Sequence, residues 1–164
     1  NHKQAINGFV LEYYQTTNQS GPMHGLDFSE VKKTGGVDDY YNNDWYPGWV
    51  HWGMSMANPL IASPIYNKDG DMTFKYNRVR AMHLGWSGDI SSEWTYLAKL
   101  SYNKTWGTPF KPIPDILENF STFASIIYTP RKWKGWRFNA SIAFDTGEIY
   151  GDNLGCQLKV RKIF

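Results

Sequence analysis

The sequence predicts an all-β fold: an antiparallel transmembrane β-barrel, to which this chain contributes about six strands. Three observations lead to it, namely long stretches of alternating apolar and polar residues, a high aromatic content, and aromatic residues near the ends of these stretches. Successive side chains of a strand point to opposite faces, so alternation separates an apolar face from a polar one. Soluble sheets usually have strands of about 5–6 residues, whereas stretches of about 10 residues suit a tilted bilayer crossing.

Five alternating stretches follow one another in residues 77–164, beginning near residues 77, 92, 118, 134 and 153. In the second of them, one side consists of Trp94, Tyr96, Ala98, Leu100 and Tyr102. Residues 4–14 form a further candidate strand, in which Phe9, Leu11 and Tyr13 share a face. We expect short turns at 88–91 and 130–135, an intermediate turn at 146–152, and a long turn at 105–117, which holds three prolines.

Residues 15–76 mostly lack the alternation and are rich in Gly, Pro, Asn and Asp. Long loops of outer-membrane barrels lie outside the cell, so this segment is predicted to be one long extracellular or lumen-entering loop. The piece 49–56 alternates within it. We interpret this piece as part of the loop; the alternative is a crossing that pairs with a strand from 57–76.

A periplasmic C-terminus places aromatic residues near both rims of such a barrel, where interfacial aromatics are enriched. The residues expected near the periplasmic rim are Trp86, Trp94, Tyr96, Tyr128, Trp133, Trp136 and Phe164. Those expected near the outer rim are Tyr13, Tyr102, Phe144 and Tyr150.

The composition narrows the classes of partner and cofactor. A chain of 164 residues is one domain, and its net charge of +2 argues against a nucleic-acid partner. No apolar run is long enough for a transmembrane helix. The lone Cys156 excludes a disulfide within the chain, and we expect a small lipid-facing or core residue there. We expect no cofactor.

The start of the chain, Asn-His-Lys, has neither an initiator methionine nor a signal peptide, so we expect a mature form or a fragment. About six crossings are fewer than the roughly eight strands of the smallest barrels. We therefore expect the C-terminal part of a larger barrel.

Two motifs resemble the Wzi capsule-assembly family, in its more divergent branch from gut bacteria. The first is residues 53–67, Gly-Met-Ser-Met-Ala-Asn-Pro-Leu-Ile-Ala-Ser-Pro-Ile-Tyr-Asn, and the second is residues 77–85, Asn-Arg-Val-Arg-Ala-Met-His-Leu-Gly. The end of the chain, from Gly151 to Phe164, resembles that family's last strand, and its terminal aromatic is similar to the assembly signal of outer-membrane barrels. The resemblance covers residues 5–164, as the C-terminal third of such a protein.

The resemblance implies a monomeric outer-membrane β-barrel of about eighteen strands in a Gram-negative bacterium. It implies a noncatalytic lectin that holds capsular polysaccharide or exopolysaccharide at the cell surface, in contact with outer-membrane lipid and lipopolysaccharide. One alternative is a porin- or transport-type channel, with a lining that includes Glu93, Lys99, Arg137, Asp145, Lys159 and Arg161. Others are a structural subunit that docks on other envelope proteins through its exposed aromatics, and a soluble β-sandwich.

A polysaccharide site needs aromatic faces that stack on sugar rings and polar groups that bind hydroxyls. Residues 38–52 contain both. The candidate binding residues are Tyr40, Tyr41, Trp45, Tyr46, Trp49, Trp52 and Trp106. The alternative is that these aromatics pack the loop against itself or mark the outer rim.

Residues in and after the first motif are further candidates. Asn58, Pro59, Ser63, Pro64 and Asn67 shape a loop that lines or constricts the lumen, or form a purely structural turn. Arg78 and Arg80 have the apolar parity at the outer end of their strand, where they bind lipopolysaccharide phosphates or, as we favour, pair with loop carboxylates. His83 has the lumen parity, and we expect it to be hydrogen-bonded rather than a ligand or base.

The sequence favours neither a metal site nor an enzyme. Asn67, Asp69 and Asp71 around Gly70 are similar to a calcium loop that lacks its closing Glu, so a β-turn is favoured. A serine hydrolase needs a serine beside a base, yet no Gly-x-Ser-x-Gly occurs and no serine is expected to pair with a histidine across the strands. Asp38 and Asp39 are adjacent in the sequence, so in an extended segment we expect them to point apart and to form no glycosidase pair.

Overall fold

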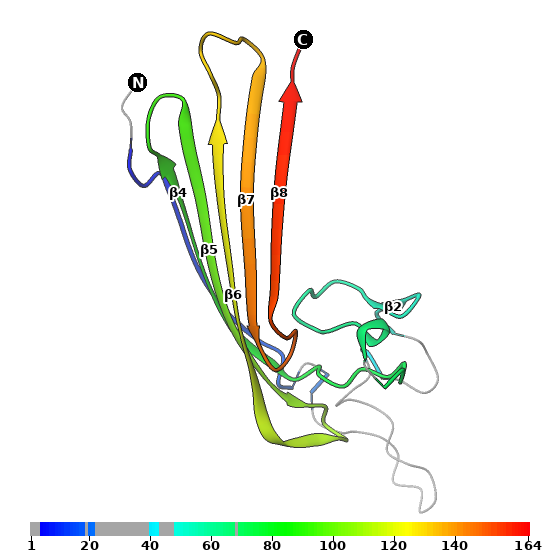
Figure 1. Cartoon of the computed structure of the whole chain (residues 1–164). Helices are drawn as coiled ribbons and strands as arrows, with labels where there is room; N and C mark the ends of the chain where they lie inside the picture. The colour runs from blue at the N-terminus through cyan, green and yellow to red at the C-terminus, as the bar shows by residue number, and fades with distance from the viewer. Residues whose placement is uncertain (1–3, 19, 22–39, 43–47, 68) are drawn as a thin grey trace, which may run out of the picture. The chain divides into compact units, whose positions relative to one another are not determined.

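The computed structural model describes residues 4–18, 20–21, 40–42, 48–67 and 69–164. Its main element is a six-stranded antiparallel sheet with the order β1-β4-β5-β6-β7-β8 (Figure 1). The strands are β1 (Gly8–Gln15), β4 (Val79–Asp89), β5 (Trp94–Gly107), β6 (Pro112–Tyr128), β7 (Trp136–Gly147) and β8 (Asn153–Lys162). A two-stranded piece, β2 (Val50–His51) with β3 (Met54–Ser55), and a 3₁₀ turn, η1 (Pro64–Tyr66), complete the elements. No helix in this described part is long and apolar enough to cross a membrane.

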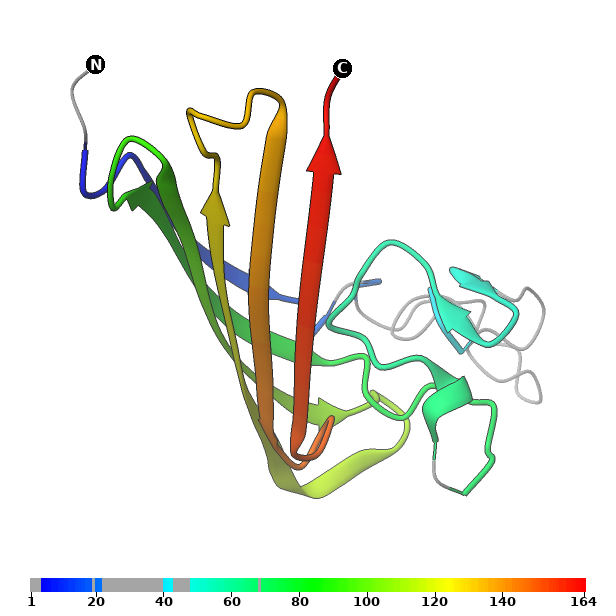
Figure 2. The same ribbon diagram turned by 45° about the horizontal axis from the view of Figure 1, so that its top comes forward.

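The six long strands confirm the predicted strands, and consecutive ones from β4 to β8 lie side by side (Figure 2). The predicted long turn at 105–117 is wrong, because β5 continues to Gly107 and β6 begins at Pro112. The connection is closed by two bonds, from Thr108 N to Lys111 O at 3.2 Å and from Lys111 N to Thr108 Oγ1 at 3.0 Å. Proline is tolerated here because Pro112 is the first residue of its strand, where no ladder donor is required.

The chain divides into two compact units, which are described separately. The sheet unit contains residues 1–13, 81–102 and 118–164, with most of the long strands. The loop unit contains residues 14–80 and 103–117, with β2, β3, η1 and the remaining ends of the long strands.

In the sheet unit, burial is the reverse of that in a water-soluble sheet. Ile142 lies on the apolar face of β7, between two neighbouring strands, and its side chain is 49% exposed. On the opposite face, Asn119 of β6 is only 1% exposed and Ser125 is also buried. Hydrogen bonds between neighbouring strands satisfy such polar side chains. Asn139 Nδ2, for example, donates to Ser125 Oγ at 2.8 Å. At these positions the apolar side chain is exposed and the polar side chains are buried.

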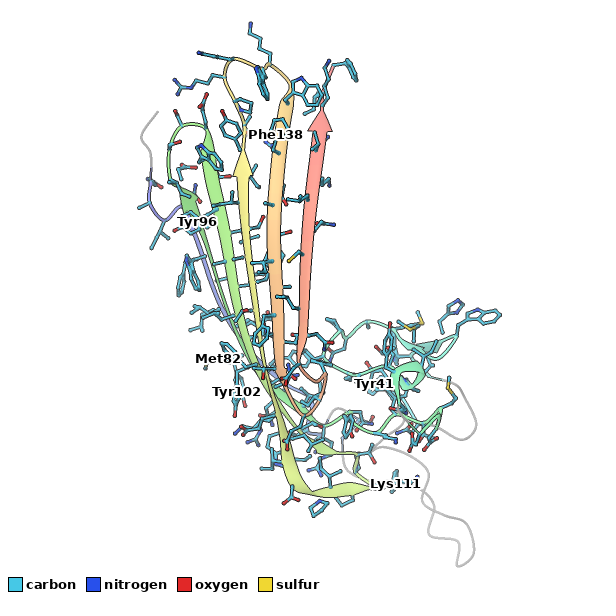
Figure 3. All side chains as sticks on the ribbon, in the orientation of Figure 1. Tyr41, Met82, Tyr96, Tyr102, Lys111 and Phe138 are labelled. Atoms are coloured by element: carbon cyan, nitrogen blue, oxygen red, sulfur yellow. The ribbon has the colours of Figure 1, made fainter. Side chains whose placement is uncertain are left out.

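Aromatic residues gather at the end of the sheet unit that carries the C-terminus. The rings of Trp94 and Tyr128 are stacked with centroids 4.5 Å apart, and Tyr128 is the register partner of Phe138. Trp133 and Trp136 each contact Phe138, at centroid distances of 6.0 and 6.1 Å. Figure 3 shows Phe138 and Tyr96 toward this end of the strands and Tyr102 toward the other. We call Trp94, Tyr128, Trp133, Trp136 and Phe138 the aromatic cluster.

The loop unit has a small core of its own. The core consists of Tyr41, Ile61, Phe74 and Val79, with Val50 and Leu60 packed against it. The rings of Tyr41 and Phe74 are 4.9 Å apart. Among the described residues, β2 and β3 pair with each other in a separate two-stranded sheet, so residues 49–56 belong to the loop unit and not to the six-stranded sheet.

We predict that Gly135→Ala destabilises the sheet, because Gly135 has φ +81° and an added Cβ would lie 2.2 Å from Ile163 O. A non-glycine residue in such a conformation costs roughly 1–3 kcal/mol. The free energy of unfolding from denaturant titration measures the loss. Gly155→Ala is the matched control, since its Cβ meets open space, and an equal loss in both variants would contradict the prediction.

Candidate functional site

Three aromatic side chains of the loop unit are exposed around β2. Tyr40 and Trp49 contact each other with ring centroids 6.4 Å apart, and Trp49 N donates to Tyr40 O at 2.7 Å. Trp49 is 46% exposed, and Trp52, which follows β2, is 85% exposed. Gly48 permits the close backbone approach, because a Cβ there would lie 2.2 Å from Tyr40 O. We call Tyr40, Trp49 and Trp52 the exposed aromatic group.

Two other predicted binding aromatics, Tyr41 and Trp106, do not join this group. Tyr41 is 7% exposed and belongs to the core, where its hydroxyl donates to Met56 O at 3.3 Å. Burial raises the pKa of the Tyr41 phenol, and Tyr14 adds to the rise. Trp106 lines a separate cavity, whereas Trp45 and Tyr46 lie outside the described residues. The structure thus separates Tyr41 and Trp106 from the exposed aromatic group.

The motif residues between 58 and 67 make structural contacts. Asn58 Nδ2 donates to Tyr14 Oη at 2.6 Å, while Asn58 Oδ1 accepts from Leu60 N at 3.0 Å. Ser63 is buried, and its hydroxyl oxygen accepts a hydrogen bond from Ser55 N at 2.8 Å. Pro64 begins η1, and Pro59, which lies between Asn58 and Ser63 in the sequence, is exposed. These contacts support the structural interpretation of the motif, because its polar groups bind the unit's own backbone and Tyr14.

Asn67 organises the turn that was weighed against a calcium site. Its Nδ2 donates to Asp71 O at 2.6 Å and Thr73 O at 2.9 Å, and Gly70 adopts φ +74°. The pKa of Asp69 is lowered, chiefly by its hydrogen bond with Lys75, with which it forms an ion pair. The pKa of Asp71 is lowered chiefly by the hydroxyl of Thr73. Within the described ranges no three His, Cys, Asp or Glu side chains gather as metal ligands.

His83 and Ser101 form a pair that sequence reasoning missed. Ser101 Oγ lies 2.7 Å from His83 Nδ1, so the expectation that no serine pairs with a histidine was wrong, whereas the expected hydrogen-bonded histidine is confirmed. Glu12 lines the same cavity of about 600 Å³ on the polar face. A nucleophilic serine also needs oxyanion donors, yet β4 and β5 each have neighbours on both sides that engage their backbone N–H groups. We therefore interpret the contact between His83 and Ser101 as a structural hydrogen bond.

Arg78 and Arg80 contact an aromatic ring and a backbone carbonyl among the described residues. Arg80 Cζ lies 4.9 Å from the centroid of the Trp106 ring, and Arg78 Nε donates to Thr17 O at 3.3 Å. Most carboxylates of the loop lie outside the described residues, so the favoured pairing with them stays a prediction. The contacts depend on the alignment of residues far apart in sequence, which the local pattern around the arginines does not reveal.

We predict that Ser63→Ala loosens the β2–β3 region, because the Ser55 amide loses its acceptor. A fully buried unsatisfied donor costs about 1–3 kcal/mol, and the Ser55 amide is half-buried, so its loss lies below this range. Hydrogen exchange of the Ser55 amide measures the effect and should become faster. Pro59→Ala is the control within the same motif, since Pro59 is exposed, and equal exchange rates in both variants would contradict the prediction.

Comparison with known proteins identifies no relative. No family model, no curated protein and no solved structure matches the chain. The resemblance to the Wzi family therefore stays a prediction, and the function has to be argued from the geometry.

Proposed function

We propose that this chain is part of an outer-membrane β-barrel of a Gram-negative bacterium and that its loop unit binds a surface polysaccharide without catalysing a reaction. The observation that carries the membrane assignment is the reversed burial of the sheet unit. An exposed isoleucine and a buried asparagine on opposite faces of adjacent strands are unfavourable in water but suit a sheet with lipid on one side.

The spacing of aromatics along three adjacent strands supports this assignment. Trp94 and Tyr102 of β5, Phe120 and Tyr128 of β6, and Trp136 and Phe144 of β7 are each eight positions apart on the apolar face. A membrane-crossing strand has about 9–11 residues between interfaces. Between these aromatics, the apolar face carries no charged residue. The spacing therefore gives an uncharged band of the length a bilayer crossing requires.

A charged residue flanks the band at the end with the aromatic cluster. Lys162 Nζ lies 5.2 Å from the centroid of Trp136 and 4.7 Å from that of Phe164. Long cationic side chains beside aromatic rings are typical of the membrane–water interface, where the ammonium group reaches polar headgroups.

The edges of the sheet support a larger barrel. β1 and β8 are the edge strands, and every residue of β8 is exposed, including Leu158 and Val160. A long apolar edge exposes unpaired backbone groups and promotes association in water. Barrels remove such edges by closure, and about eight strands are the fewest that close. We therefore propose that further strands pair with these edges.

The exposed aromatic group supports the binding half of the proposal. Aromatic faces stack on the C–H faces of sugars, and exposed rings that are held in place lose little conformational entropy on binding. The backbone bond between Trp49 and Tyr40, and the pairing of β2 with β3, hold the backbone of this group. The channel alternative leaves this exposed surface without a role, whereas the scaffold alternative uses it to dock on other envelope proteins.

The test is polysaccharide binding by the full chain in detergent, with purified surface polysaccharide from the source bacterium. The variant carries Tyr40→Ala, Trp49→Ala and Trp52→Ala, and we expect at least about tenfold weaker binding, since such contacts are each worth roughly 0.5–1.5 kcal/mol. Trp133→Ala is the control, an exposed tryptophan of the sheet unit, and should bind normally.

Two results would contradict the proposal. One is unchanged binding by the triple variant, which would remove the aromatic group from the site. The other is the absence of polysaccharide binding together with solute flux in a liposome-swelling assay, which would favour the channel.

A further inference from the structure

Two arginines and a tryptophan share a cavity in the loop unit. The cavity has a volume of about 530 Å³ and is lined by Thr17, Asn18, Arg78, Arg80, Trp106 and Pro109. Ligand pockets usually have volumes of about 300–1,000 Å³. Two cations and no acidic residue occur among these described lining residues, so the cavity attracts anions.

The backbone beneath these side chains is firmly held. Trp106 N donates to Arg78 O at 3.2 Å, and Arg78 N donates to Gly107 O at 3.1 Å. Buried Thr105 adds a bond from its hydroxyl to Arg78 O at 2.9 Å. Arg78 and Arg80 are two positions apart in an extended segment, so both side chains project to the same face. The spacing thus places both arginines on one face, and the backbone pairing with β5 places Trp106 beside Arg80.

The arginines keep donors for a ligand. A guanidinium group has five N–H donors, and the hydrogen bond that Arg78 makes to Thr17 O uses only Nε. Arg80 Cζ lies over the Trp106 ring, 4.9 Å from its centroid, and the Arg80 guanidinium group donates no hydrogen bond to another described residue. Arg78 is half-buried, so its charge is less screened than that of an exposed side chain.

We infer that this cavity binds the carboxylate of an acidic sugar residue in the surface polysaccharide. This inference rests on the proposed function and deepens it by naming the class of glycan. A planar carboxylate accepts two parallel hydrogen bonds from a guanidinium fork. Trp106 offers apolar surface to the sugar ring, and Thr17 and Asn18 offer polar groups to its hydroxyls. A lipid phosphate would use the arginines but would leave these three side chains without a role.

The test compares two probes: surface polysaccharide purified from the source bacterium, and the same polymer after chemical reduction of its carboxyl groups to alcohols. The full chain in detergent should bind the native polymer at least about tenfold more tightly, as expected for charge-assisted hydrogen bonds. The double variant Arg78→Gln, Arg80→Gln should bind both polymers equally, with the affinity of the unaltered protein for the reduced polymer. Arg78→Lys, Arg80→Lys should restore part of the preference.

The control is Arg137→Gln, Arg161→Gln, which removes two exposed arginines that are register partners in the sheet unit. It loses the same charge and should keep the full preference for the native polymer. Retention of the preference by the Arg78, Arg80 variant would overturn the inference. The inference would also be overturned if the Arg78, Arg80 variant lost only its binding of lipid A in vesicles, because the cavity would then bind a lipid phosphate.

Failure of this inference is distinguishable from failure of the proposed function. If the unaltered protein binds both polymers equally and the Tyr40, Trp49, Trp52 variant binds neither, the polysaccharide site stands and the carboxylate site is excluded. If the unaltered protein binds neither polymer, the proposed function fails and the inference fails with it.

Discussion

The pairing of backbone groups between long strands is the interaction on which the rest of the structure depends. Because the ladder satisfies the backbone, each face of the sheet is free to match its surroundings. The register pairs residues of the same polarity: Ala124 pairs with Ile142 on one face, and Ser125 pairs with Ser141 on the other. A shift of one residue would move every apolar side chain to the polar face. The two faces therefore specify the register as much as the hydrogen bonds do.

The loop unit is stabilised by different means, because its core is small. Side chains substitute for strand pairing there: Asn42 Nδ2 donates to Phe74 O at 2.9 Å, and Asn42 Oδ1 accepts from Phe74 N at 2.8 Å. Asn58, Ser63 and Asn67 act in a similar way on nearby polar groups. Polar residues thus hold a backbone that displays aromatic and cationic side chains. Binding chemistry often lies on such loops, supported by a more rigid scaffold.

Local patterns made the long strands and their faces predictable, since a period of two can be read within one segment. The strand ends were less predictable: the prolines at 112 and 114 indicated a turn, although they lie at the start of β6. The burial of single side chains and the contacts between residues far apart in the sequence could not be predicted from local patterns. Tyr41 turns into the core beside exposed Tyr40, and Ser101 meets His83 although 18 residues separate them. The cavity around Arg80 and Trp106 likewise depends on the pairing of β4 with β5.

The lone Cys156 allows the central claim, that the apolar face contacts lipid, to be measured directly. It is exposed on the apolar face of β8, and Gln157 lies on the other. A nitroxide attached to Cys156 in lipid bilayers should collide often with oxygen and rarely with a water-soluble nickel complex. The label on Gln157→Cys in a Cys156→Ser background should show the opposite preference. Equal access of the nickel complex to both labels would contradict a lipid-facing sheet.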